Sequence, residues 1–299
     1  ATAYIDVRLA QRRLAVARAN VAIQRGGLTY ASDRHEAGLV PGLDIAQAES
    51  SIATTEATIP SLEVDLDRAI YRLAVLLGSP IAPLREELAE VRPIPLAPAE
   101  IATGLPVNLI RNRPDLRAAE RSLAAETARI GVAEADLYPS FDLSAALGQQ
   151  ALELGDLFDG GARRWSVGVN SFTNVFNFGG VQANVKAQEA RARQALTRYE
   201  QTLLLSIEEV EAAMTAQRRE RRRAEALRRA VAANERSGDF SEKLYRGGEV
   251  DFQNLRDTQR TLLDVQDQLA VSEATIAKNM VTLFLALGGS WDADEDLLR

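Results

Sequence analysis

Two segments of the chain, 38–79 and 248–289, align with each other without a gap at a constant offset of 210 residues. Gly38 coincides with Gly248 in this alignment, and Gly78 coincides with Gly288. Apolar residues recur every seven positions in each copy: Ile52, Ile59, Leu66 and Leu73 in one, and Leu262, Leu269, Ile276 and Leu283 in the other. A second row (Thr55, Leu62, Ala69, Leu76) runs beside the first. Such rows are typical of helices packed as coiled coils. The repeat therefore predicts two long helices, each ending at a glycine.

The composition favours long helices over sheets and gives no sign of an enzyme. Alanine, leucine, arginine and glutamate dominate, and only 5% of the residues are aromatic. The chain has no cysteine, and its one histidine, His35, lies in no recognisable nucleophile motif. No cluster of metal ligands appears either. We therefore expect no catalytic residue, no cofactor and no metal site.

The charge pattern argues against nucleic acid as a partner. The net charge is −7, and the arginines between Arg218 and Arg229 are interrupted by Glu220 and Glu225, as on a solvated helix face. No apolar run approaches the roughly 20 residues of a membrane helix, and no secretion signal opens the chain. If a membrane is involved, strands must cross it.

The first repeat is predicted to be a helical pair over residues 1–78. Its first helix covers 1–34, and Pro41 and Gly42 then force a turn. The second helix runs to Leu77 with a bend at Pro60 inside it. Six prolines mark residues 79–113 as an irregular connector.

The second repeat contains a predicted β-hairpin between helices. A helix is expected over 114–137, because Pro114 suits a first turn. Alternation of apolar with polar or small residues then predicts two strands within 138–178, one around Phe141 and one from Trp165 through Phe172 and Phe176. Residues 179–299 form the second helical pair. Its first helix, about 65 residues to Tyr245, would be about 100 Å long, so it needs lateral partners to bury its apolar stripe.

Several motifs resemble the outer-membrane factor family, the TolC/OprM/NodT-type exit ducts of tripartite efflux pumps. They are Arg113-Pro114-Asp115-Leu116-Arg117-Ala118-Ala119-Glu120-Arg121, Ile130 to Pro139, Val175-Phe176-Asn177-Phe178-Gly179-Gly180, Glu208-Glu209-Val210-Glu211, Tyr245-Arg246-Gly247-Gly248 and Leu287-Gly288-Gly289-Ser290-Trp291. The resemblance covers essentially the whole chain. It implies a mainly α fold, in which three protomers share an α-helical barrel in the periplasm and a β-barrel in the outer membrane of a Gram-negative bacterium. Its expected partners are a homotrimer, a periplasmic adaptor, an inner-membrane pump and outer-membrane lipid.

The chain departs from this family at its front. Family members carry a hairpin in each repeat, and the offset places the first hairpin before Ala1. The family's barrel has twelve strands, four per protomer, whereas this chain offers two. We therefore expect an N-terminally truncated member that lacks about 105 residues of its first repeat.

The helix tips are the predicted gate of the duct. The resemblance implies that Asp44, Gln47, Tyr245, Asn254 and Asp257 line the periplasmic aperture. Three copies of Asp257 would form a carboxylate ring that attracts cations. The alternatives are a helix N-cap for Asp44, with Asp251 capping the second tip, and a solvated surface position for Asp257. Tyr245 either bonds to a neighbouring tip or is simply packed.

The same turns are the predicted docking points for the adaptor, at Gly38, Leu39, Gly248 and Glu249. A structural explanation for the two glycines is a positive φ at a tight turn. Both interpretations are compatible with each other.

The hairpin aromatics Tyr138, Phe141 and Trp165 are predicted to lie at the membrane interface. A soluble hairpin would alternate in the same way. The expected function is passive export through the duct of an RND-type drug or small-molecule pump. The alternatives are a non-transporting coiled-coil scaffold and an outer-membrane channel for type I protein secretion. The sequence does not show which substrate is transported, which pump is the partner, or whether the mature protein is lipid-anchored.

Overall fold

The computed structural model describes residues 1–95, 113–153, 158, 160–173 and 179–289. They fall into two compact units, one from residues 1–105 and 208–299 and the other from 106–207. Part of the predicted connector (96–112) lies outside the described residues, and so do Val175 to Phe178, Ser290 and Trp291 of the family motifs.

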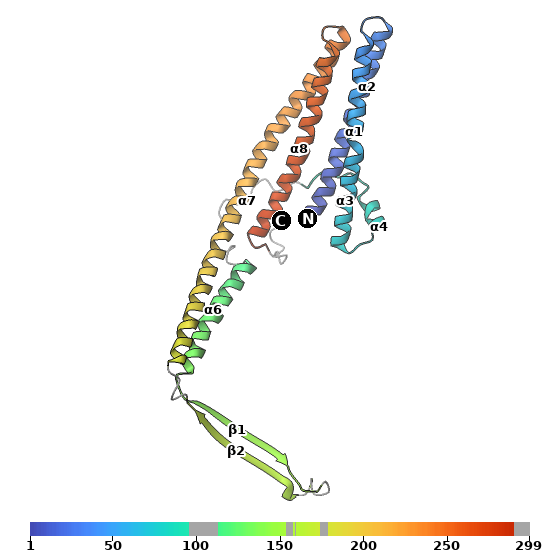
Figure 1. Ribbon diagram of the computed structural model, residues 1–299. Coiled ribbons are helices and arrows are strands. Elements are labelled where there is room, and N and C mark those ends of the chain that lie inside the picture. The colour runs from blue at the N-terminus through green and yellow to red at the C-terminus, as the bar shows by residue number, and fades with distance from the viewer. Residues whose placement is uncertain (96–112, 154–157, 159, 174–178, 290–299) are drawn as a thin grey trace, which may run out of the picture. The chain divides into compact units, whose positions relative to one another are not determined.

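The first unit is a layer of long helices (Figure 1). Its elements are α1 (Thr2–Glu36), α2 (Gly42–Glu56), α3 (Ile59–Leu77), α4 (Ile81–Leu88), α8 (Phe252–Ala286) and the later part of α7 (Gly180–Gly247). Helix α1 packs against α2 and α3 on one side and against α8 on the other. Helices lie where the sequence predicts them, with ends that differ by a few residues, except that the helix expected to end at Leu77 is divided into α2 and α3.

The two repeats end their helices with the same hydrogen bonds. Gly38 and Gly248 have φ of 70° and 78°, as expected for the tight turns. The amides of the residues after them, Leu39 and Glu249, donate to the carbonyls of Arg34 and Leu244, each at 2.9 Å. This six-to-one bond is the mark of a Schellman C-cap. Ser79 and Gly289 make the same bond after Gly78 and Gly288, so the 210-residue repeat extends to the backbone hydrogen bonds.

The predicted bend at Pro60 is a full break between α2 and α3. Pro60 lies in the first turn of α3, where its missing N–H costs no helical bond. The hydroxyls of Thr55, Thr58 and Ser61 bond to carbonyls three or four residues back, which competes with regular helix geometry. The equivalent of Pro60 in the second repeat is Ala270, and α8 continues through it without interruption.

Helix α1 presents an apolar row to its own repeat and a polar row to the other. Val7 packs with Ile70 and Leu73 of α3, and Leu14 packs with Leu62. The residues one position earlier, also seven apart, face α8 with polar side chains. The contacts are Asp6 with Lys278, Arg13 with Asp267 at 2.6 Å, and Asn20 with Gln266 at 3.0 Å. One predicted core position is wrong, because Leu76 is more than half exposed.

One stretch of α8 is long and apolar enough, by length and composition, to cross a membrane. The expectation that no such stretch exists is therefore wrong. Ala270, Ala274, Ala277 and Leu283 of this helix are buried against neighbouring elements. These contacts are those of a core helix in a helical layer.

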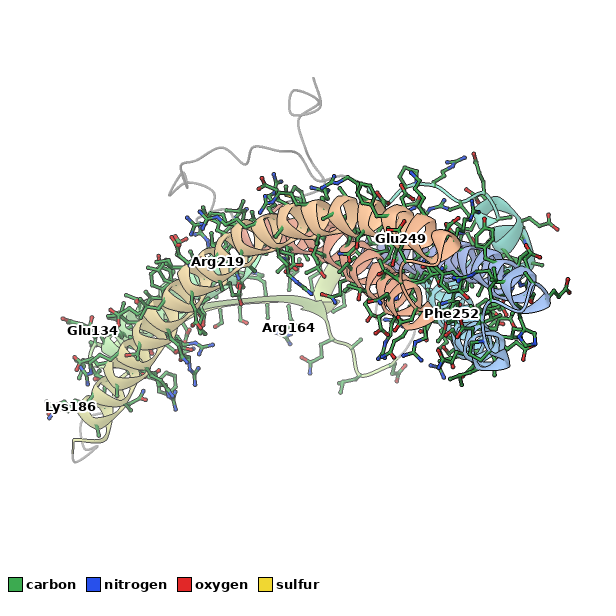
Figure 2. All side chains as sticks on the ribbon, turned by 90° about the horizontal axis from the view of Figure 1, so that it is seen from above. Glu134, Arg164, Lys186, Arg219, Glu249 and Phe252 are labelled. Carbon is green, nitrogen blue, oxygen red and sulfur yellow. The ribbon has the colours of Figure 1, made fainter. Side chains whose placement is uncertain are left out.

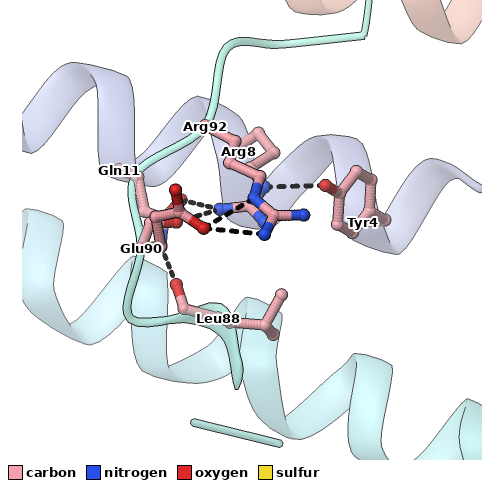
Figure 3. Close-up of polar contacts among 6 residues, drawn as sticks. All are labelled: Tyr4, Arg8, Gln11, Leu88, Glu90 and Arg92. Atoms are coloured by element: carbon pink, nitrogen blue, oxygen red, sulfur yellow. Dashed lines mark hydrogen bonds and ion pairs between the residues drawn. The ribbon is translucent and has the colours of Figure 1, made fainter. Parts of the chain in front are cut away.

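The segment after α4 is clamped to α1 by a buried arginine (Figure 3). Arg8 donates at 2.7 Å to the Glu90 carbonyl and to Gln11 Oε1, and its Nε donates to the Tyr4 hydroxyl at 3.0 Å. Gln11 in turn donates to the Leu88 carbonyl at 2.6 Å. The clamp holds backbone carbonyls that have no partner in a regular element.

The second unit contains α6 (Pro114–Ala135), the strands β1 (Ser140–Gln149) and β2 (Arg163–Phe172), and the first part of α7. Pro114 opens α6 as predicted. The Arg113 guanidinium beside it lowers the pKa of Asp115. The strands pair antiparallel with Leu143 opposite Val169 and Leu147 opposite Trp165. This register gathers the alternating apolar residues of both strands, from Leu143 to Leu147 and from Trp165 to Val169, on one face, as the alternation predicted, whereas Phe172 opposite Ser140 lies on the other face.

Candidate functional site at the helix tips

Two turns, after α1 and after α7, form the tips of the first unit. Leu39 is 67% exposed and Glu249 is also exposed. Glu249 lies in the turn and Phe252 is the first residue of α8; both are labelled in Figure 2. Below the turns, Ala31, Ala48, Tyr245, Phe252 and Leu255 form one buried cluster. The cluster draws residues from both repeats, so it fixes the two tips to each other.

Tyr245 is the centre of this cluster. Its side chain is fully buried, and its ring meets that of Phe252 edge-on at 5.4 Å. The hydroxyl donates to Asp44 Oδ2 at 3.0 Å. Because Asp44 lies in the first turn of α2, this bond connects the second repeat's tip to the first repeat's tip.

Two arginine–tyrosine contacts flank the hydroxyl bond. The Arg34 guanidinium lies 4.8 Å from the centre of the Tyr245 ring and also donates to the Tyr245 carbonyl. In the reciprocal direction, Arg246 lies 3.6 Å from the centre of the Tyr30 ring. Each helix end thus supplies one cation and one aromatic ring to the other.

The surroundings of Tyr245 keep its hydroxyl protonated. Burial raises the pKa of Tyr245 to about 12, and the hydrogen bond to the Asp44 carboxylate adds to this effect. The hydroxyl is therefore a donor across the whole physiological pH range.

The N-cap interpretation of Asp44 is wrong. Pro41 precedes α2 and no side chain caps that helix, while Asp44 is its third residue and accepts from Tyr245 instead. Asp251 does cap α8, as expected: its carboxylate accepts from the Asn254 amide at 3.1 Å and from the Asn254 side chain at 2.8 Å. The predicted gate residue Asn254 is therefore held in the cap.

The other predicted gate residues do not join this contact. Gln47 is half-buried on α2, one turn after Asp44. Asp257 is exposed on α8, and its carboxylate lies 3.3 Å from the guanidinium of the neighbouring Arg256. Sequence reasoning missed Arg34, Tyr30 and Arg246. The available signal was a tyrosine and an arginine close together at the end of each helix, which on its own is equally explained by the helix dipole.

The hairpin places the predicted aromatics at opposite ends of its strands. Phe141 is the second residue of β1 and Tyr138 comes just before the strand, whereas Trp165 is the third residue of β2, at the far end of the hairpin. Both Phe141 and Trp165 are more than 70% exposed on the apolar face. Among the described residues, no group of acidic or histidine side chains is placed to hold a metal ion.

Comparison with known proteins identifies the family. The model of the outer membrane efflux protein family matches residues 1–79 and 105–289. The chain belongs to this family. Nodulation protein T of Rhizobium leguminosarum bv. trifolii is 34% identical over 291 residues, which cover 97% of this chain and 62% of that protein. The toluene efflux pump outer membrane protein TtgF of Pseudomonas putida is 31% identical over 98% of this chain and 60% of its own length.

The fold agrees with the solved structure of the outer-membrane channel OprN. The TM-score is 0.87 at 35% identity, over 97% of this chain and 65% of that one. The chain spans about three fifths of the length of the curated relatives that it matches. Membership of the outer membrane efflux protein family confirms the expected fold class and a location in the outer membrane, with the helical part in the periplasm. It also confirms that the chain is not an enzyme.

Proposed function

We propose that this chain is the larger part of one subunit of a passive exit duct in a tripartite efflux pump. Three subunits would share a helical barrel in the periplasm and a β-barrel in the outer membrane. The hairpin supports this arrangement, because its apolar face is exposed although it carries Trp165 and Phe141. Leu204 and Leu205 of α7 are also exposed, as expected of a helix that completes its packing against a neighbour.

The tips would close the duct, and the hydrogen bond from Tyr245 to Asp44 is the observation that carries this proposal. It joins the two repeats at the end of the helical layer, where a small movement of one tip breaks it. In a trimer, three Asp257 carboxylates would lie two turns inside the tips and favour cations. Separation of the tips would then open a path that is selective by charge rather than by shape.

The exposed turn residues would receive a periplasmic adaptor, and an inner-membrane pump would supply the energy. Gly38, Leu39, Gly248 and Glu249 all lie at the surface of the tips. The name of the relative TtgF, a toluene efflux pump protein, favours small-molecule export over type I protein secretion. The exposed apolar strands disfavour a scaffold, which would have no use for them.

Export is tested with the full-length protein in a strain that lacks its own efflux channels and carries the matching pump and adaptor. Cells with the wild-type protein should accumulate less ethidium than cells without it. Equal accumulation in both strains would reject the exit-duct function.

The carboxylate ring is tested in planar bilayers. Asp257→Ala should lower the preference of the reconstituted channel for cations. The control is Asp264→Ala, an exposed carboxylate seven residues deeper on the same helix. Equal effects of the two substitutions would place the constriction elsewhere.

A further inference from the structure

Two arginines begin β2 at adjacent positions and therefore lie on opposite faces of the hairpin. Arg163 pairs with Gln149 and Arg164 pairs with Gly148. Because side chains alternate along a strand, Arg163 shares the face of Trp165 and Val167. Arg164, labelled on β2 in Figure 2, shares the other face with Ser166.

Connectivity fixes which end of the hairpin these arginines occupy. Ser140 and Phe172 are the strand ends nearest to α6 and α7, which belong to the periplasmic helical part. The Gln149–Arg163 end is the opposite one and faces the cell exterior. Each strand has 10 residues, and at about 3.3 Å per residue and a tilt of about 40° it spans about 25 Å of membrane.

This span equals the height of the apolar band of an outer-membrane barrel, so Arg163 lies at the level of the outer headgroups. Along its face the apolar rungs end with Leu147 and Trp165, and the Gln149–Arg163 rung is the first polar one. Among the described residues, no carboxylate forms an ion pair with Arg163 or Arg164. A cation at the edge of an apolar surface, with an amphipathic tryptophan beside it, is placed to bind an anion of the membrane surface.

We propose that Arg163, with Gln149 and Trp165 beside it, binds a phosphate of an outer-leaflet glycolipid headgroup. The planar guanidinium donates two parallel hydrogen bonds to a phosphate, the Gln149 amide adds a further donor, and the indole ring lies against the upper acyl chains. Arg164 faces the inside of the duct and takes no part in this site. The inference rests on the proposed function, because it requires β1 and β2 to be strands of the outer-membrane barrel.

The test is a titration of the full-length detergent-solubilised trimer with diphosphoryl lipid A, followed by native mass spectrometry. Arg163→Gln should weaken lipid binding about fivefold, the effect of one interfacial cation. Arg164→Gln removes the same charge one residue away on the opposite face, and it should leave the affinity within a factor of about two of wild type. Arg163→Lys, which keeps the charge, should recover most of the binding.

The matched pair makes the proposal easy to overturn. Equal losses in the two glutamine variants would reveal a general charge effect, and no loss in either would remove the site. If Arg163→Gln does not assemble, a low affinity in assembled Arg163→Lys would equally reject a charge-based site. Full competition by excess inorganic phosphate would assign the site to free phosphate instead of a headgroup. Lipid binding through Arg163 in a wild-type protein that fails the ethidium assay would reject the exit duct and leave this site intact.

Discussion

The Tyr245 hydroxyl donates to Asp44 across 201 residues of sequence, between positions that are not equivalent in the repeat. The offset of 210 maps Tyr245 onto His35 and Asp44 onto Asn254. His35 Nδ1 instead lies 2.9 Å from the Val40 carbonyl, and Asn254 bonds to Asp251. The two repeats therefore share the backbone hydrogen bonds of their glycine turns but not the tip contact, so each protomer has one such bond.

Removal of the Tyr245 hydroxyl should weaken the contact between the tips without removing the aromatic ring from the buried cluster. Tyr245→Phe keeps the ring against Phe252 and Arg34 but deprives Asp44 of its donor, at a cost of about 1 kcal/mol. We expect a higher closed-state conductance of the full-length channel in planar bilayers. Tyr30→Phe is the control, because its ring also meets an arginine but no hydrogen bond from its hydroxyl is described. If Tyr245→Phe and Tyr30→Phe had the same closed-state conductance, the hydrogen bond from Tyr245 to Asp44 would have no role in closing the duct.

The tip contact should weaken in strong alkali. The pKa of Tyr245 is raised to about 12, above the value of about 10 for an unfolded tyrosine. The stability that follows from this difference is complete below about pH 10 and is lost as the pH rises through about 12. The tyrosinate absorbance of wild type minus that of Tyr245→Phe should titrate near 12. Asp44→Asn should lower the pKa of Tyr245, because it removes the carboxylate, but burial should still hold this pKa above that of an exposed tyrosine. If this difference in absorbance titrated with a pKa near 10, Tyr245 would not be buried against Asp44.

The two turn glycines should differ in their tolerance of alanine. Both have positive φ, so alanine is strained by about 1–2 kcal/mol at either position. A Cβ at Gly38 would meet open space, whereas at Gly248 it would come within 3.1 Å of Arg34 Nη2. Gly248→Ala should therefore also displace Arg34 from Tyr245 and raise closed-state conductance above that of Gly38→Ala. Indistinguishable conductances and melting temperatures would show that Arg34 adjusts freely.

The repeat and the residue alternation predicted the helices, the glycine turns and the two alternating strands of the hairpin, because those features depend on neighbours close in sequence. The partners of Asp44 and Arg34 could not be predicted in this way. They depend on how α1 and α2 meet α7 in space. The internal symmetry does not reveal the contact, because the equivalents of Tyr245 and Asp44, His35 and Asn254, do not bond to each other. For the same reason, an arginine near the end of α1 was indistinguishable from a solvated charge.

The polar row of α1 was hidden by the apolar row beside it. Val7 and Leu14 are apolar and seven residues apart, as in a coiled coil, whereas Asp6 and Arg13, one residue earlier, have the same spacing without an evident partner in the sequence. The structure shows that the apolar row unites a repeat and the polar row joins the repeats. Buried or half-buried polar contacts of this kind set register more than they add stability.

A charge exchange across this seam should reveal its coupling. Arg13→Asp faces Asp267 with a like charge, and the double variant Arg13→Asp/Asp267→Arg should regain part of the loss. Both side chains are about one third exposed, so we expect a coupling of about 0.5–1 kcal/mol in a double-mutant cycle. The exposed pair Arg25–Glu56 provides the comparison and should couple less. A double variant no more stable than the worse single variant would exclude a direct contact.

The Arg8 clamp should matter more for stability than the arginine next to it. Arg8→Met keeps much of the buried volume but leaves the Glu90 carbonyl and Gln11 Oε1 without their donor, at a cost of about 1–3 kcal/mol. The thermal midpoint of the full-length protein should fall, and limited proteolysis should cut sooner after α4. Arg92→Ala is the control in the same cluster, since Arg92 is exposed and, within the described part of the chain, bonds only the Glu90 side chain (Figure 3). If the two variants were cut at the same rate as wild type, the segment after α4 would have to be held by its apolar contacts, such as the packing of Ile94 with Ile5 and Ala274.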